Sequence, residues 1–89
     1  MIDRKTQDET IGRLKKIEGQ IKGVERMIES KKYCIDIINQ IRAVRGALDT
    51  LALEVMKRHI NSCVSEAIRK GSDRSTVDEL METIYRFVK

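Results

Sequence analysis

An unbroken apolar stripe in the middle of the chain is the feature that most limits the fold. Apolar residues recur at every third or fourth position from Ile38 to Val55, and the spacing continues through His59 and Cys63 to Ala67. No proline interrupts the stripe. This spacing is typical of one face of an α-helix, so we predict one long helix over residues 33–70. Gly46 costs such a helix about 1 kcal/mol without breaking it.

Two shorter amphipathic segments flank the long one. A 3, 4, 3, 4 spacing of apolar residues predicts a helix over residues 7–29; its members are Leu14, Ile17, Ile21, Val24 and Ile28. Gly71 suits the cap that ends the long helix, and Asp73 or Ser75 can cap a third helix beyond it. The sequence therefore predicts an all-α fold in which residues 1–89 form a single domain of three helices, the central one longest.

The length of the central helix implies a second copy of the chain. Thirty-eight residues at ~1.5 Å each extend roughly 57 Å. A chain of 89 residues and 10.3 kDa cannot cover an apolar stripe of that length by itself. The simplest partner is the same helix of another copy, in an antiparallel dimer that the first helices close into a four-helix bundle. The small residues in the segment 46–48 suit the crossing point.

Composition argues against several functional classes. No run of ~18 apolar residues is present, so we expect no membrane span, and the chain lacks a signal-peptide pattern, so we expect a cytoplasmic protein. Two cysteines are too few for a disulfide scaffold. There is no Cys-x-x-Cys motif, paired acid/base cluster or glycine-rich phosphate loop, so we expect no enzyme.

Positive charge is concentrated in the first two helices. Residues 1–32 hold nine Lys and Arg against six Asp and Glu, residues 33–70 hold six against four, and residues 71–89 hold three against four. The candidates for contact with DNA phosphates are Arg13, Lys15, Lys16, Lys22, Arg42 and Arg45. By composition alone, the same residues fit a solvated helix face with i, i+4 ion pairs such as Glu18–Lys22 better than a DNA contact.

Both cysteines and the single histidine belong to the long helix. His59 and Cys63 are one turn apart on one face. Cys34 is 25 residues before His59, about 20° short of seven full turns, so it shares that face but lies about 37 Å away. In an antiparallel dimer, Cys34 of one chain meets His59 and Cys63 of the other. The spacing therefore predicts two equivalent metal sites per dimer.

The type of ligand favours a soft metal ion. Two thiolates and one imidazole suit Cu(I) first, and Zn(II) second because Zn(II) usually takes four ligands. The competing interpretation is that the cysteines are small core residues and the histidine a polar group at an edge.

Three segments resemble the copper-sensing repressors of the CsoR/RcnR family. They are Arg13–Gly23, the start of the long helix from Tyr33-Cys34 to Val44, and His59–Cys63. The resemblance covers nearly the whole chain. It implies a homodimer that assembles into a homotetramer, and a repressor that binds double-stranded operator DNA and dissociates when Cu(I) binds. It also implies that Cys34, His59 and Cys63 hold Cu(I), and that Tyr33 and Glu79 relay metal binding through the histidine.

Other branches of the family remain alternatives. Its nickel and cobalt sensors add an N-terminal histidine and replace the last cysteine, whereas this chain begins Met1-Ile2-Asp3-Arg4 and keeps Cys63. Its formaldehyde sensors carry proline where this chain has Ile2, and its persulfide sensors lack the histidine. A response to Zn(II) or reactive sulfur, and a copper-buffering protein without DNA binding, stay open at this point.

Overall fold

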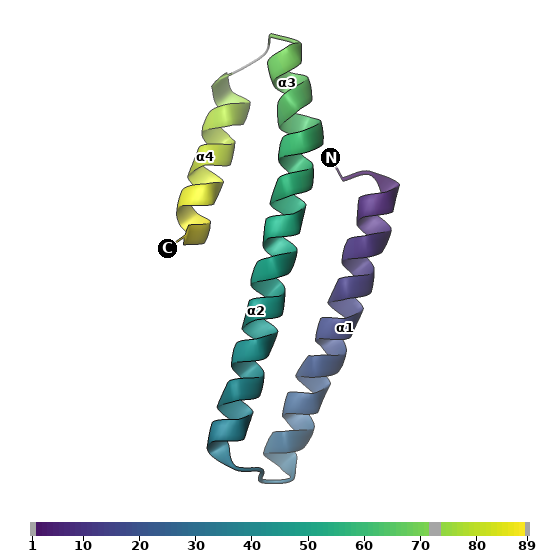
Figure 1. The fold of residues 1–89 in the computed structure, drawn as a ribbon, viewed down its shortest axis with the longest axis vertical. Helices are drawn as coiled ribbons and strands as arrows, with labels where there is room; N and C mark the ends of the chain where they lie inside the picture. The colour runs from purple at the N-terminus through teal and green to yellow at the C-terminus, as the bar shows by residue number, and fades with distance from the viewer. Residues whose placement is uncertain (1, 72–73, 89) are drawn as a thin grey trace. The chain divides into compact units, whose positions relative to one another are not determined.

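The chain is almost entirely helical (Figure 1). The computed structural model describes residues 2–71 and 74–88, apart from the side chains of residues 63, 64 and 74. Within these residues it contains no strand, and its helical elements are α1 (Arg4–Glu29), α2 (Cys34–His59), the π-helical turn η1 (Ile60–Val64), α3 (Ser65–Arg69) and α4 (Arg74–Val88). Because α2, η1 and α3 follow one another without a gap, the helical segment 34–69 confirms the long central helix and the three-helix, all-α fold.

The ends of the helices follow from local hydrogen bonds. Asp3 precedes α1, and its carboxylate accepts the Thr6 amide at 2.7 Å, which satisfies one of the free N–H groups of the first turn. The helix therefore begins at Arg4, three residues before the predicted start. Ser75 lies inside α4 rather than ahead of it, so it is not the cap of that helix, while Asp73 lies outside the described residues.

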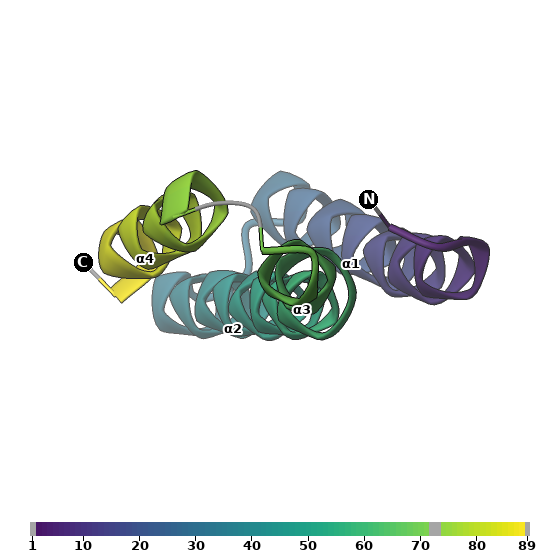
Figure 2. The same cartoon turned by 90° about the horizontal axis from the view of Figure 1, so that it is seen from above.

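Residues Ile2–Met56 form one compact unit, an antiparallel hairpin of α1 and the first part of α2. Figures 1 and 2 both show the two helices side by side. Ile17 and Val24 of α1 and Val44 and Leu51 of α2 are buried between them. Three half-buried residues pack against this core, namely Ile37, Ala47 and Val55. The hairpin thus has a small core with one row of apolar side chains from each helix.

About half of the apolar positions predicted for α1 and α2 lie outside this core. On an ideal helix, positions 14, 21 and 28 of α1 are rotated about the helix axis by roughly 20–60° from Ile17. Positions 41 and 48 of α2 are rotated by roughly 40–60° from Val44, and all five lie toward the same side of the hairpin. Their side chains remain 41–56% exposed. We call this surface the apolar face; it consists of Leu14, Ile21, Ile28, Ile41 and Leu48.

The turn between the two helices contains a residue with a left-handed backbone. After the C-cap Ser30, Lys31 has φ 56°. The amides of Lys31 and Lys32 donate to the carbonyls of Ile28 and Met27 at 3.1 and 2.9 Å, which is the Schellman pattern of helix termination. Glycine is the usual residue at this position because a Cβ atom strains the left-handed conformation.

The second compact unit consists of the described residues between 57 and 88, and we call it the C-terminal unit. Gly71 has φ 71° and its amide donates to the carbonyl of Ile68 at 3.0 Å, so it ends α3 as expected. Two ion pairs, Arg69–Glu66 and Lys70–Glu66, support the last turn of α3. Among the described helices, none is both long and apolar enough to cross a membrane.

Candidate metal centre and nucleic-acid interface

Cys34 opens α2 in the hairpin unit. Its thiol is free and exposed, and on an ideal helix its position lies beside that of Ile41 on the apolar face. The preceding residue, Tyr33, is 69% exposed, and its carbonyl accepts the first backbone bond of the helix from the Ile37 amide at 3.2 Å. The local structure therefore presents a thiol that an incoming ligand or a second chain can reach.

His59 is the last residue of α2, and its side chain is half-buried in the C-terminal unit. The backbone of Cys63 belongs to η1, directly after it, while the Cys63 side chain is outside the described part of the structure. Among the described side chains, no group of three or more His, Cys, Asp or Glu residues lies close enough to hold a metal ion. The donor set itself, two thiols and an imidazole, is chemically suited to a soft metal ion.

Glu79 lies on α4, in the C-terminal unit, with an exposed side chain. Its carbonyl accepts the Thr83 hydroxyl at 2.9 Å. Its side chain lines a shallow depression of about 200 Å³ together with Glu82, Thr83 and Arg86. A carboxylate in this position is accessible to a hydrogen-bond donor from another element.

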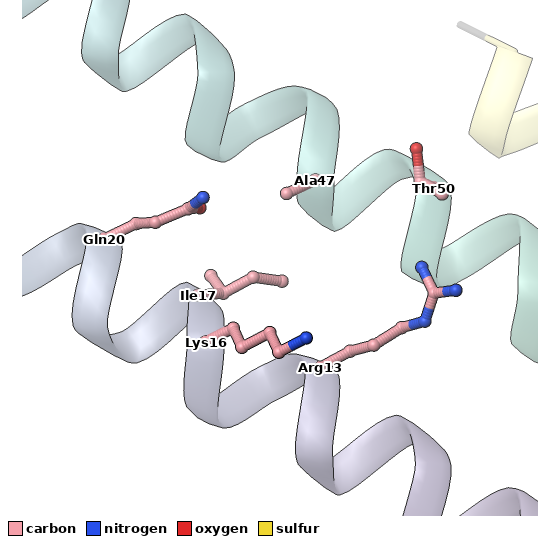
Figure 3. A pocket seen from close by; sticks show the side chains of 6 residues that line it. All are labelled: Arg13, Lys16, Ile17, Gln20, Ala47 and Thr50. Carbon is pink, nitrogen blue, oxygen red and sulfur yellow. The ribbon is translucent and has the colours of Figure 1, made fainter.

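A groove between α1 and α2 contains two of the predicted DNA contacts (Figure 3). It has a volume of about 420 Å³, and its lining residues are Arg13, Lys16, Ile17, Gln20, Ala47 and Thr50. Arg13 and Gln20 are displaced from Ile17 in the direction opposite to the apolar face. The hairpin therefore has two different sides, one apolar and one with polar and cationic groups around a groove.

Arg13 is also part of an ion pair that joins the two helices. Its Nε lies 3.1 Å from Oε2 of Glu54, which is only 25% exposed. Sequence reasoning did not identify Glu54, although a signal was available. Arg13 lies 20 residues before Tyr33 and Glu54 lies 20 residues after Cys34, so an antiparallel hairpin places them opposite each other.

The remaining predicted DNA contacts are exposed but lie away from the groove. Lys15 and Lys22 of α1, and Arg42 and Arg45 of α2, all have exposed side chains and none of them lines it. The structure thus brings together Arg13 and Lys16 out of the six basic candidates. The other four remain available to phosphates elsewhere on the hairpin surface.

Comparison with known proteins identifies the class. A family model described as metal-sensitive transcriptional repressor matches residues 6–86, and the chain belongs to this family. Two relatives are described as copper-sensing transcriptional repressors. CsoR of Bacillus subtilis is 39% identical over 85 residues, which cover 96% of this chain and 84% of the relative. RicR of Mycobacterium tuberculosis is 48% identical over 59 residues, covering 66% of this chain and 62% of the relative.

Solved structures support the same assignment. The copper-sensing repressor CsoR with Cu(I) from Geobacillus thermodenitrificans is 42% identical and matches with a TM-score of 0.92, covering 100% of this chain and 93% of the other. The nickel-responsive transcriptional regulator InrS is 36% identical and matches with a TM-score of 0.79, covering 90% of each chain. The all-helical fold predicted from the sequence is therefore that of a known group of metal-responsive regulators.

Proposed function

We propose that this protein is a Cu(I)-responsive transcriptional repressor, in which residues 1–89 form one domain that both senses the metal and binds DNA. In this proposal it binds operator DNA without metal and dissociates when Cu(I) binds. The observation that carries the proposal is the donor set of Cys34, His59 and Cys63 in a chain of this family. Relatives with 39% and 48% identity are described as copper-sensing.

Cys34, His59 and Cys63 would hold the metal ion. Thiolates are soft ligands that select Cu(I), and Cu(I) accepts a low coordination number that three such ligands can satisfy. Zn(II) usually takes four, so a zinc response requires a further ligand. A sensor of reactive sulfur needs only the two thiols, and for such a sensor the histidine has no evident purpose.

The site would be shared between two chains. The 25 residues that separate Cys34 from His59 keep these ligands far apart along one helix. In an antiparallel dimer, Cys34 of one chain approaches His59 and Cys63 of its partner. The exposed apolar face supports such pairing, because a dimer in which it is covered removes Leu14, Ile21 and the other side chains of this face from water. Two dimers would then form the tetramer.

DNA would be bound chiefly through phosphate contacts. Arg13 and Lys16 at the groove, with Lys15, Lys22, Arg42 and Arg45 on the surrounding surface, offer cations that displace counterions from the duplex. A formal net charge of +4 per chain supports this, because each additional copy in an oligomer adds to the attraction. Binding of this kind weakens as the salt concentration rises.

An anaerobic titration with Cu(I) tests the proposal directly. The chain is bound to promoter DNA carrying a fluorescent label, and the anisotropy is followed while Cu(I) is added and the bound ions per subunit are counted. We expect one ion per chain and release of DNA as the sites fill. Tight copper binding with no affinity for DNA would favour a copper buffer instead. Release by Zn(II) or by persulfide, with no response to Cu(I), would assign a different signal.

A further inference from the structure

We infer that Ser65 is a positioning residue for the metal site, because it holds the π-helical turn η1 in which Cys63 lies. The inference rests on the proposed function and names a residue outside the predicted ligand set. It begins from the location of the turn. η1 starts at Ile60, directly after His59, and ends at Val64. The only part of the 34–69 helical segment with π-helical geometry therefore begins directly after the second predicted ligand, His59, and contains the third, Cys63.

Ser65 makes two hydrogen bonds to one carbonyl at the end of this turn. Its amide donates to the carbonyl of Ile60 and also to that of Ser62, and its hydroxyl donates to the Ile60 oxygen at 3.0 Å. The two bonds to Ile60 span five residues, which is the spacing of a π-helix rather than of an α-helix. Ser62 behaves differently, because its hydroxyl donates to the carbonyl of Arg58 at 2.7 Å over four residues, as in an ordinary α-helix.

The π-turn changes the angular relation between the two ligand positions. In an α-helix, the four residues from His59 to Cys63 cover about 40° more than one full turn. In a π-helix a turn contains more than four residues, so the same step covers less than a full turn. His59 itself keeps an α-helical backbone, with φ −61° and ψ −44°. The π-turn therefore moves the backbone of Cys63 around the helix axis while that of His59 stays in place.

A π-turn is rarely stable without local support, and such turns occur frequently at functional sites. Here the extra bond from the Ser65 hydroxyl favours the five-residue spacing over the four-residue one. Loss of this hydroxyl removes the side-chain bond and favours a regular α-helix, which shifts Cys63 relative to His59. The expected consequence is weaker Cu(I) binding by a chain that is still fully folded.

The test compares Ser65→Ala with Ser62→Ala in the full-length chain. Both serines are exposed and both have a hydroxyl that donates to a backbone carbonyl of the same helix, so the second variant is a matched control. Anaerobic competition with a chromophoric Cu(I) chelator gives the affinity, and the ultraviolet thiolate-to-copper absorption reports the site itself. We expect Ser65→Ala to weaken Cu(I) binding by about tenfold, whereas Ser62→Ala stays within about twofold of wild type.

Two further measurements separate positioning from folding. Ser65→Thr retains a hydroxyl and should restore much of the affinity. The Tm of Ser65→Ala should stay the same or rise, because alanine favours a helix more than serine does. Equal Cu(I) affinity and absorption in Ser65→Ala and wild type would overturn the inference and leave the proposed function intact. A wild-type chain that binds no Cu(I) would overturn the proposed function, and this inference with it.

Discussion

Arg13 of α1 and Glu54 of α2 face each other across the hairpin, with Nε of the arginine 3.1 Å from Oε2 of the glutamate. The contact uses one of the five N–H donors of the guanidinium group, so the two terminal nitrogens keep their capacity to bind a phosphate. Glu54 thus holds a cation at the groove between the helices. Its own negative charge also lies close to any phosphate that Arg13 binds.

Substitution of Arg13 tests the groove as a DNA-binding surface. Arg13→Ala should weaken operator binding and make the fall of log affinity with log salt less steep. The slope should change by about 1 for each subunit whose Arg13 contacts the DNA, because each of these subunits loses one phosphate contact. Fluorescence anisotropy at several salt concentrations measures both quantities. Arg86→Ala is a suitable control, since Arg86 pairs with Glu82 on α4 and is not among the predicted contacts. An unchanged slope for Arg13→Ala would mean that DNA binds elsewhere.

Removal of the charge on Glu54 should have the opposite effect. In Glu54→Gln the amide oxygen can still accept the bond from Arg13, while repulsion of the phosphate disappears. We expect DNA to bind up to about fivefold more tightly for each subunit that contacts it, since one interaction between partly exposed charges is worth at most ~1 kcal/mol. The same titration at low salt gives the largest difference. Weaker binding by Glu54→Gln would show that the carboxylate charge itself is needed to hold Arg13.

Mixed dimers test whether the metal site is shared. Subunits with Cys34→Ala and with Cys63→Ala each lose both sites when alone. In a mixed dimer the two lesions fall in one site, and the other site is intact. After subunit exchange at equal amounts, tight Cu(I) binding should return to about a quarter of the wild-type capacity, because half of the dimers are mixed and each has one intact site. No recovery, with exchange confirmed by mass spectrometry, would exclude the shared site.

Glu79 tests the relay from the metal to DNA. If His59 holds Cu(I) as proposed, its second ring nitrogen would be free to donate to Glu79 or contact Tyr33, and Cu(I) would then favour the state that releases DNA. Glu79→Ala should leave Cu(I) affinity close to normal and reduce copper-induced release about tenfold, a loss of about 1.4 kcal/mol of coupling. Parallel titrations of metal and DNA measure the two effects. Full release by Glu79→Ala would make Glu79 an ordinary surface carboxylate.

The left-handed residue in the hairpin turn predicts a change in stability. Lys31→Gly removes the strain of a Cβ atom at φ 56° and should stabilise the fold by about 1 kcal/mol. Gly71→Ala makes the reverse change at φ 71° in the other helix-ending turn and should destabilise it by a similar amount, about 1 kcal/mol. Urea unfolding at one fixed protein concentration gives the free energy of unfolding of each variant for comparison with wild type. A less stable Lys31→Gly would show that the lysine side chain stabilises the fold by more than its left-handed backbone conformation destabilises it.

Much of the fold could be predicted from the sequence because local spacing determines it. The uninterrupted apolar spacing predicted helix over 33–70, and the structure has helix over 34–69. Gly71 ends that segment as expected, because glycine adopts a positive φ without strain. The family could also be identified from three short segments. The metal ligands, the relay residues and the single-domain assignment remain predictions, since they depend on a second chain, a bound ion or the arrangement of the two units.

The sequence by itself determined where the helices form and which residues share a helical face, since a helix depends on hydrogen bonds and side-chain directions within a few residues. Tertiary structure alone decided which residues of that face are buried and which remain exposed. The stripe of α1 contains both Ile17, which is buried, and Ile21, which is exposed, although the two differ by only about 40°. The packing of α2 decides between them, because a single neighbouring helix covers only part of a broad apolar stripe. The pairing of Arg13 with Glu54 was decided in the same way, because it depends on the register between two helices.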